Sequence, residues 1–149
     1  LFLVATFHNL MLLDLSPVDW IGLGNAHAGK ILDGQWWRLL TALTLHADWL
    51  HLLSNLTIGG LFIVWLCRYL YSVLVWSLFL ASGLFGNLFN ALLQHPDHRA
   101  VGASTAVFGT VGILAAIAVI RCRQIPRRRW LLPVASALAL LAMSTLKLR

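Results

Sequence analysis

The stretch "WLHLLSNLTIGGLFIVWL", residues 49–66, decides the fold class, because it is apolar and long enough to cross a lipid bilayer as a single helix. Further apolar stretches cover residues 71–93, 103–120 and 130–146. Of the 149 residues, 60% are hydrophobic and 11% are charged, and the mean hydropathy is +0.82. Soluble domains carry about 25% charged residues. We therefore predict an all-α protein, a polytopic bundle of transmembrane helices.

The chain begins with a short apolar segment, residues 1–13, which lacks an initiating Met and is too short to cross a bilayer alone. If this segment is counted as part of a span, the sequence predicts about five membrane spans in total. Residues 14–45 form a long looped segment with several glycines, and their tryptophans suit a membrane interface. We expect one membrane domain, residues 1–149, truncated at both ends.

The basic residues predict the orientation. Arg68 follows the second span, and "RCRQIPRRR", residues 121–129, follows the fourth. Cytoplasmic loops carry an excess of Lys and Arg, so both ends belong on the cytoplasmic side. The acidic residues then fall on the opposite side: Asp14, Asp19, Asp33, Asp48 and Asp97. The basic run is interpreted as a solvated loop against anionic lipid, so the expected partner is the bilayer and not nucleic acid.

Polar side chains open the second span, in "HADWLHLLSN", residues 46–55. His51 and Asn55 are four residues apart and therefore share a helix face. One interpretation is hydrogen bonding between helices, which such residues often supply in membranes. The other is a site of chemistry. A metal site is not expected, because the chain contains no Glu and no HExxH pattern.

A second candidate is "GASTAVFG", residues 102–109, in which Ser104 opens a helix just after Gly102. Its small residues are typical of a close-packed helix face. Alternatively, Ser104 is a nucleophile. The unpaired N–H groups of a helix start favour negative charge and would meet an oxyanion formed there. If spans two and four are parallel, His51 and Asn55 lie at the same depth and can donate from the other side.

Together with "WWR", residues 36–38, these two motifs resemble the rhomboid family of intramembrane serine proteases. The resemblance runs through the apolar spans between residues 30 and 121, and residues 90–109 look especially like bacterial rhomboids. It implies a bundle of six or seven helices, of which about five of an expected six are present. It also implies cleavage of transmembrane substrates near the membrane surface, by a Ser on the fourth helix and a His on the sixth, with no cofactor.

By this resemblance Ser104 matches the nucleophile, and His51 and Asn55 match the pair that stabilises the oxyanion together with the Ser104 N–H. Further residues match positions with a structural role near the site: His46, Trp37, Arg38, Gly102, Phe108 and Gly109. Trp37 and Arg38 match a pair that shapes the first loop. Phe108 matches an aromatic position near the catalytic His.

Two departures from the family pattern bear on activity. Thr105 stands where the family usually has a Gly. No His follows Ser104; the six histidines are His8, His27, His46, His51, His95 and His98. A Ser hydroxyl is a weak nucleophile without an adjacent base. We expect a multi-pass protein of the bacterial inner membrane, whose parent architecture is an endopeptidase and whose present chain is inactive. The alternative is an inactive rhomboid-like protein that binds transmembrane partners.

Overall fold

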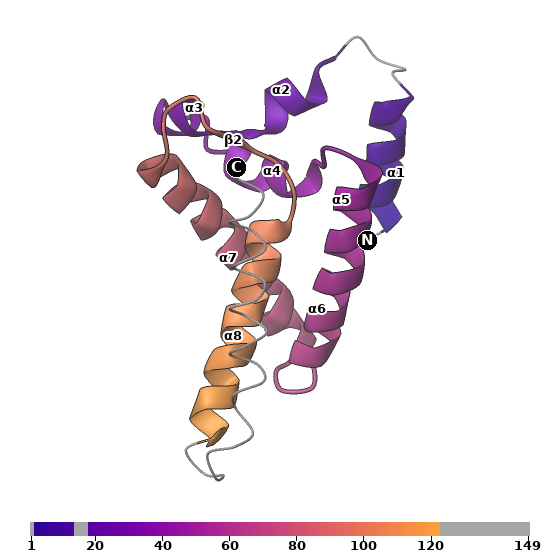
Figure 1. Ribbon diagram of the computed structural model, residues 1–149, viewed down its shortest axis with the longest axis vertical. Helices are drawn as coiled ribbons and strands as arrows, with labels where there is room; N and C mark the ends of the chain where they lie inside the picture. Colours follow the sequence, from indigo (N-terminus) through magenta and orange to yellow (C-terminus); the bar gives the residue numbers. More distant parts are fainter. Residues whose placement is uncertain (1, 14–17, 123–149) are drawn as a thin grey trace. The chain divides into compact units, whose positions relative to one another are not determined.

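The computed structural model describes residues 2–13 and 18–122 (Figure 1). It divides into two compact units, residues 1–110 and residues 111–149. In the second unit the described part continues one helix as far as Cys122. The features discussed below lie in the first unit.

Three apolar segments of the described chain are long enough to cross a membrane: Trp49–Leu66, Ser72–Leu93 and Ser104–Arg121. They confirm the second, third and fourth predicted spans to within about one residue, and they confirm the all-α class. The fifth predicted span, residues 130–146, lies outside the described residues. The first apolar segment forms the short helix α1 (Phe2–Leu12).

The span Trp49–Leu66 contains a local irregularity in its helix. It begins as the α-helix α5 (Trp49–Ser54), passes through one π-helical turn, η1 (Asn55–Gly59), and continues as α6 (Gly60–Leu66). A single π turn inside an α-helix is rare and frequently marks a functional site. The other two spans are the regular helices α7 (Ser72–Leu93) and α8 (Ser104–Cys122).

The long segment before the second span is folded into short elements. They are α2 (Trp20–Gly24), β1 (Ala26–His27), α3 (Ala28–Leu32) and α4 (Arg38–Thr44). Strand β1 pairs antiparallel with β2 (Arg99–Ala100), with Ala26 opposite Ala100. The backbone N–H of Ala28 also donates to the His98 carbonyl at 2.9 Å. The first loop is therefore fixed to the loop that leads to Ser104.

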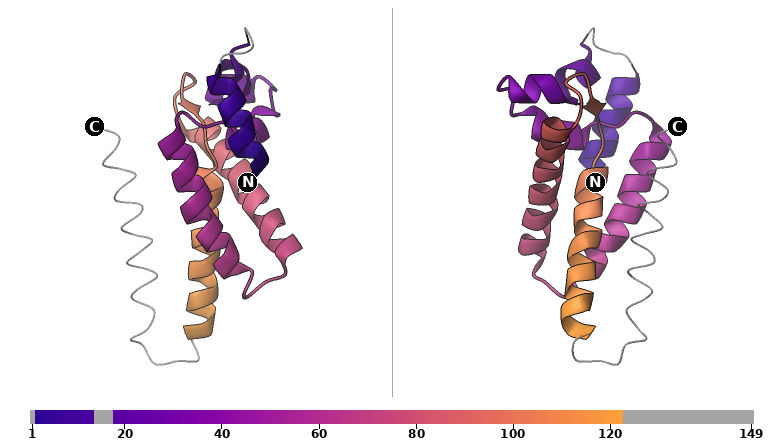
Figure 2. Two further views of the ribbon diagram at one scale, coloured as in Figure 1. Left: turned by 90° about the vertical axis from the view of Figure 1, so that its right-hand side faces the viewer. Right: turned by 60° about the vertical axis from the view of Figure 1, so that its left-hand side comes forward.

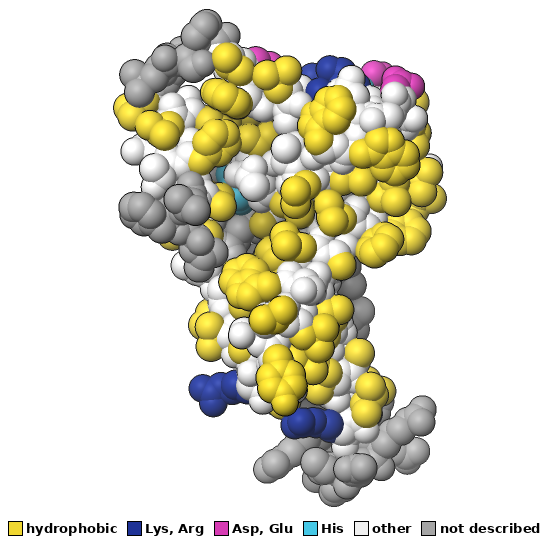
Figure 3. All heavy atoms as spheres, turned by 180° about the vertical axis from the view of Figure 1, so that it is seen from behind, with side chains coloured by type: hydrophobic (Ala, Val, Ile, Leu, Met, Phe, Trp, Pro, Cys, Tyr) yellow, Lys and Arg dark blue, Asp and Glu magenta, His cyan; other side chains and the backbone are white. Residues whose placement is uncertain are grey.

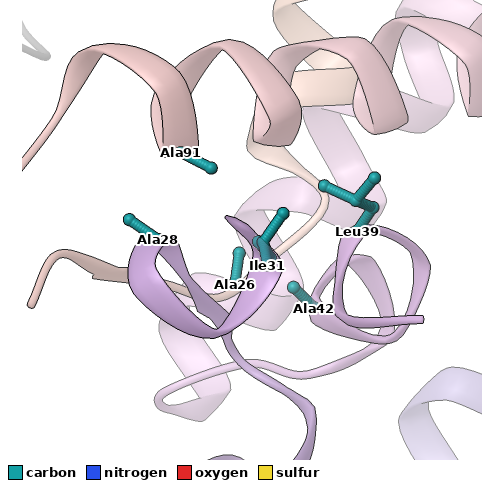
Figure 4. Packing of buried hydrophobic residues seen from close by; sticks show 6 residues of the cluster. All are labelled: Ala26, Ala28, Ile31, Leu39, Ala42 and Ala91. Carbon is teal, nitrogen blue, oxygen red and sulfur yellow. The ribbon is translucent and has the colours of Figure 1, made fainter. Parts of the chain in front are cut away.

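Small side chains let these elements pack closely. The buried cluster in Figure 4 contains Ala26, Ala28, Ile31, Leu39, Ala42 and Ala91. Four of its six members are alanines, so the backbones of α3 and α4 can lie close to α7. The first loop therefore packs against α7 through this cluster.

The acidic residues of the described chain lie at the end where α5 starts, together with the basic Lys30 and Arg99. Asp48 precedes α5 and Asp97 follows α7, whereas Arg68 lies between α6 and α7. Arg68 is thus at the far end of both spans. Figure 3 shows hydrophobic side chains over much of the surface between the ends, and Leu61 on α6 is 72% exposed. An apolar exterior of this kind suits contact with lipid. Figure 2 shows the short first-loop elements at the same end as the start of α5.

Candidate active site

His51 lies in the first turn of α5. The turn is closed by Asp48, whose Oδ1 accepts a hydrogen bond from the His51 backbone N–H at 2.7 Å. An aspartate at this position satisfies an otherwise unpaired donor and favours the helix start. The backbone of His51 is therefore fixed at the point where the first loop ends and α5 begins.

Asn55 begins the π turn one helical turn further on. Its Nδ2 donates to the His51 carbonyl at 3.0 Å, and Ser54 Oγ donates to the same carbonyl at 2.9 Å. A primary amide has two N–H donors, so this bond leaves one for another acceptor. Asn55 is half-buried and its amide is held by its own helix, which orients it without using its full donor capacity.

Gly102 brings the Ser104 loop to these two side chains. Its φ is +107°, a backbone conformation that favours glycine. A Cβ at Gly102 would lie 2.6 Å from His51 Nε2 and 3.5 Å from Asn55 Nδ2. The Gly102 N–H donates to the Ala42 carbonyl at 2.8 Å, which ties the loop to α4. Only a residue without a side chain fits between this backbone and the His51 ring.

Ser104 is the first residue of α8 and is half-buried. The helix starts with the bond from the Val107 N–H to the Ala103 carbonyl, at 3.0 Å. The Ser104 N–H thus belongs to the donors that a helix start leaves without an intrahelical partner. Two residues of chain span at most about 7 Å, so Ser104 lies in the same neighbourhood as Gly102. The structure brings Ser104, His51 and Asn55 to one end of the spans.

Thr105, the residue that departs from the family pattern, is turned toward α7. Its Oγ1 lies 3.4 Å from Asn87 Oδ1, and a Cβ on Gly86 would lie 3.1 Å from the Thr105 Cβ. Asn87 is 2% exposed, and its Nδ2 donates to the Leu39 carbonyl at 2.9 Å. The Thr105 side chain therefore belongs to the helix interface.

Sequence reasoning missed Asn87, although an amide within an apolar span was a usable signal, because such groups usually face the bundle interior. Asn87 joins α7 to α4 and to the start of α8.

Glycines set the close approach of α8 to its neighbours in the first unit. A Cβ on Gly109 would overlap the Ser82 side chain of α7. A Cβ on Gly59, in the π turn, would lie 2.7 Å from Val107 Cγ2. Gly109 thus packs closely against α7. Phe108 is 40% exposed, and its proposed place beside a catalytic His stays a prediction.

Arg38 holds the first loop together. It is 3% exposed, and its Nη1 donates to the carbonyls of Gly22 and Asn25, at 3.1 and 3.0 Å. Its Nε donates to Gln35 Oε1 at 2.7 Å. Burial lowers the pKa of Arg38 from its ordinary value, and the guanidinium remains charged as arginine does in proteins. Trp37 caps α4 and is 56% exposed, so only one member of the pair makes buried contacts.

His46 is buried behind His51. Its ring centroid lies 5.3 Å from that of His51 and 6.3 Å from that of His8 on α1. Burial lowers the pKa of His46 to about 4, and the like charges of His51 and His8 act in the same direction. His46 is thus a neutral imidazole at physiological pH.

His8 is the second residue that sequence reasoning missed. It is 1% exposed, and its ring centroid lies 5.1 Å from that of Trp49. The available signal was a lone histidine in an apolar stretch. Among the described residues, no group of three or more His, Cys, Asp or Glu is placed to hold a metal ion.

The fold and site define a class: a helical membrane protein with a serine at a helix start, beside a histidine and an asparagine from a neighbouring span. Comparison with known proteins gives the family. The family model of the rhomboid domain matches residues 33–148, and the chain belongs to the rhomboid family.

Individual relatives agree with this assignment. The Bacillus subtilis protein YdcA, whose name places it with the rhomboid proteases, is 35% identical over 66% of this chain and 49% of its own length. Rhomboid-like protease 3 of Toxoplasma gondii is 40% identical over 68% of this chain and 38% of its own. Inactive rhomboid protein 1 of Drosophila melanogaster is 39% identical over 57% of this chain and 6% of its own.

The chain spans about half or less of the length of these curated relatives. No solved structure matches it.

Proposed function

We propose that the protein is an intramembrane serine endopeptidase that cleaves transmembrane substrates with Ser104 as nucleophile. The observation that carries the proposal is the fit of Gly102 against His51 and Asn55, because it places two side-chain donors beside the start of the Ser104 helix. The family supports a protease by resemblance, and the names of relatives include proteases.

In the proposed reaction, Ser104 Oγ attacks the scissile carbonyl carbon while its proton passes to a histidine base. The carbonyl oxygen becomes an oxyanion that accepts hydrogen bonds from the Ser104 N–H, the His51 ring and the Asn55 amide. The intermediate collapses as the C–N bond breaks, and the protonated base gives its proton to the leaving amine. Water then attacks the acyl carbon while the histidine takes its proton, and the ester C–O bond breaks as that proton returns to Ser104 Oγ and a carboxylic acid leaves. Loss of one oxyanion donor typically costs about 10²–10³ in rate.

The histidine base is the part of this mechanism that residues 105–149 do not contain. We propose that the base stands on a further span of the full-length protein, and that residues 1–149 alone do not turn over substrate. The site lies at the end of the spans opposite Arg68. By the positive-inside rule that end faces away from the cytoplasm, in a bacterial inner membrane.

The second candidate is a catalytically inactive member of the family that binds transmembrane partners. One relative is named an inactive rhomboid, which favours this candidate. The fold is common to both candidates, so the decision rests on chemistry at Ser104.

The deciding experiment compares the full-length protein with its Ser104→Ala variant in liposomes that contain a transmembrane test substrate. Cleavage by the parent and none by Ser104→Ala supports the protease. Labelling by a serine-directed fluorophosphonate, lost in the same variant, is the second readout. An intact, folded parent that neither cleaves nor labels favours the inactive binder. Ser104-dependent cleavage by residues 1–149 alone overturns the proposed role of an external base.

A further inference from the structure

A row of four aromatic rings connects α1 to the candidate site. The His8 ring lies edge to face against Trp49, with centroids 5.1 Å apart and an interplanar angle of 89°. It lies in the same way against His46, at 6.3 Å and 87°. His46 in turn packs against His51 at 5.3 Å and 70°. His8 is therefore wedged between two residues of the chain that leads into α5.

The two middle rings of the row are buried. His8 and His46 are 1% and 2% exposed. Both ring nitrogens of His8 are buried without a hydrogen-bond partner among the described residues. The edge-to-face contacts are therefore what holds the plane of the His8 ring, whereas His46 also interacts with the backbone of Thr44. Such edge-to-face contacts between rings prefer a particular geometry.

The orientation of His51 matters because an oxyanion donor acts over a narrow range of distances and angles. Its backbone N–H is held by Asp48, and the direction of its ring is set by the groups that surround the side chain. On one side the ring meets the Gly102 backbone, and on another it meets His46. A change in the plane of His46 thus changes one of the surfaces against which the His51 ring is packed.

We propose that His8 is a positioning residue for His51: its ring, wedged between Trp49 and His46, fixes the plane of His46 and thereby the direction in which the His51 ring donates. This inference rests on the proposed function of His51 in stabilising the oxyanion. It gives α1, which contributes no residue to the candidate site, a role in catalysis through ring packing.

The test uses the full-length protein in liposomes, with the variants His8→Ala and His8→Phe. His8→Ala removes the ring and should lower kcat about tenfold, which is less than the 10²–10³ expected for loss of a donor itself. The KM should stay within about twofold, because an interaction made only in the transition state affects kcat and kcat/KM equally. His8→Phe keeps a planar ring of similar size and should restore most of the parent kcat. The control is Leu10→Ala, a truncation of a half-exposed side chain on the same helix.

A second readout follows His51 without catalysis. In protein labelled with ¹³C and ¹⁵N at histidine, His8→Ala should shift the ring resonances of His51, and His8→Phe should shift them less. Unchanged His51 resonances overturn the inference even if the parent is an inactive family member. Unchanged kcat in His8→Ala also overturns it, as does an equal loss in His8→Ala and Leu10→Ala. Failure of the proposed function itself would give a different result: cleavage that persists in the Ser104→Ala variant.

Discussion

Gly102 and His51 are in direct contact: a Cβ at position 102 would lie 2.5 Å from His51 Cε1 and 2.6 Å from Nε2. The two residues are separated by a complete helical hairpin in the sequence. Their contact sets the distance between the loop before Ser104 and the first turn of α5, and it leads to the first prediction.

Gly102→Ala should reduce cleavage by the full-length protein more than 100-fold, a loss on the order of that of an oxyanion donor. The new methyl group would displace the His51 ring, and the φ of +107° adds about 1–2 kcal/mol of backbone strain for any L-residue. Initial rates in liposomes measure the effect. Gly60→Ala is the matched control, because a Cβ there meets nothing within 4 Å. Equal activity of Gly102→Ala and the parent would contradict the proposed geometry.

Asn55→Ala should lower kcat by about 10²–10³-fold while Ser104 stays reactive toward a fluorophosphonate, since one donor is lost and others remain. Thr57→Ala is the control, because Thr57 Oγ1 also donates to a backbone carbonyl of its own helix, at 2.7 Å, but is exposed. If both variants lose activity equally, the effect comes from the π turn and not from the amide.

Asn87→Leu should destabilise the protein by about 1–2 kcal/mol, because the Leu39 carbonyl and Thr105 lose their partner in the buried interface. Thermal unfolding in detergent measures the loss. Asn90→Leu, on the same helix but only half-buried, is the control and should change the midpoint less. A gain of stability in Asn87→Leu would show that hydrophobic packing outweighs these hydrogen bonds.

Stability should fall as the pH drops from about 6.5 toward 4, with a contribution of about 3 kcal/mol from His46. The pKa of His46 is lowered to about 4 by burial in the folded protein, so over this range the unfolded chain binds the proton and the folded chain does not. The contribution is therefore complete above pH 6.5. The difference in unfolding midpoint between pH 7.5 and 4.5 should shrink in His46→Phe. An undiminished difference would assign the pH effect to other groups.

Hydropathy predicted the spans almost to the residue, because apolar length is a property of the local sequence. The shared face of His51 and Asn55 followed from their spacing alone. The contact of Gly102 with both is tertiary and was not predicted, since the family resemblance assigned Gly102 only to a structural position near the site. Arguments from residue spacing assume 3.6 residues per helical turn, and the π turn that begins at Asn55 departs from this period.

The first loop was harder to predict because its short elements depend on distant partners. Residues 14–45 were expected to be a looped amphipathic segment, whereas α2, α3 and α4 are held by Arg38 and by pairing with β2. His8 was overlooked for the same reason: its partners, Trp49 and His46, lie about forty residues further along the chain.

The pairing of Ala26 with Ala100 has a consequence for biosynthesis. Two membrane spans, Trp49–Leu66 and Ser72–Leu93, separate the two strands and must be inserted before the strands can meet. The loop before Ser104 therefore takes its final form only after both spans have been inserted. A ribosome-bound chain that has not yet released residues 99–100 cannot form this pairing, so the loop before Ser104 lacks its β-strand partner until then.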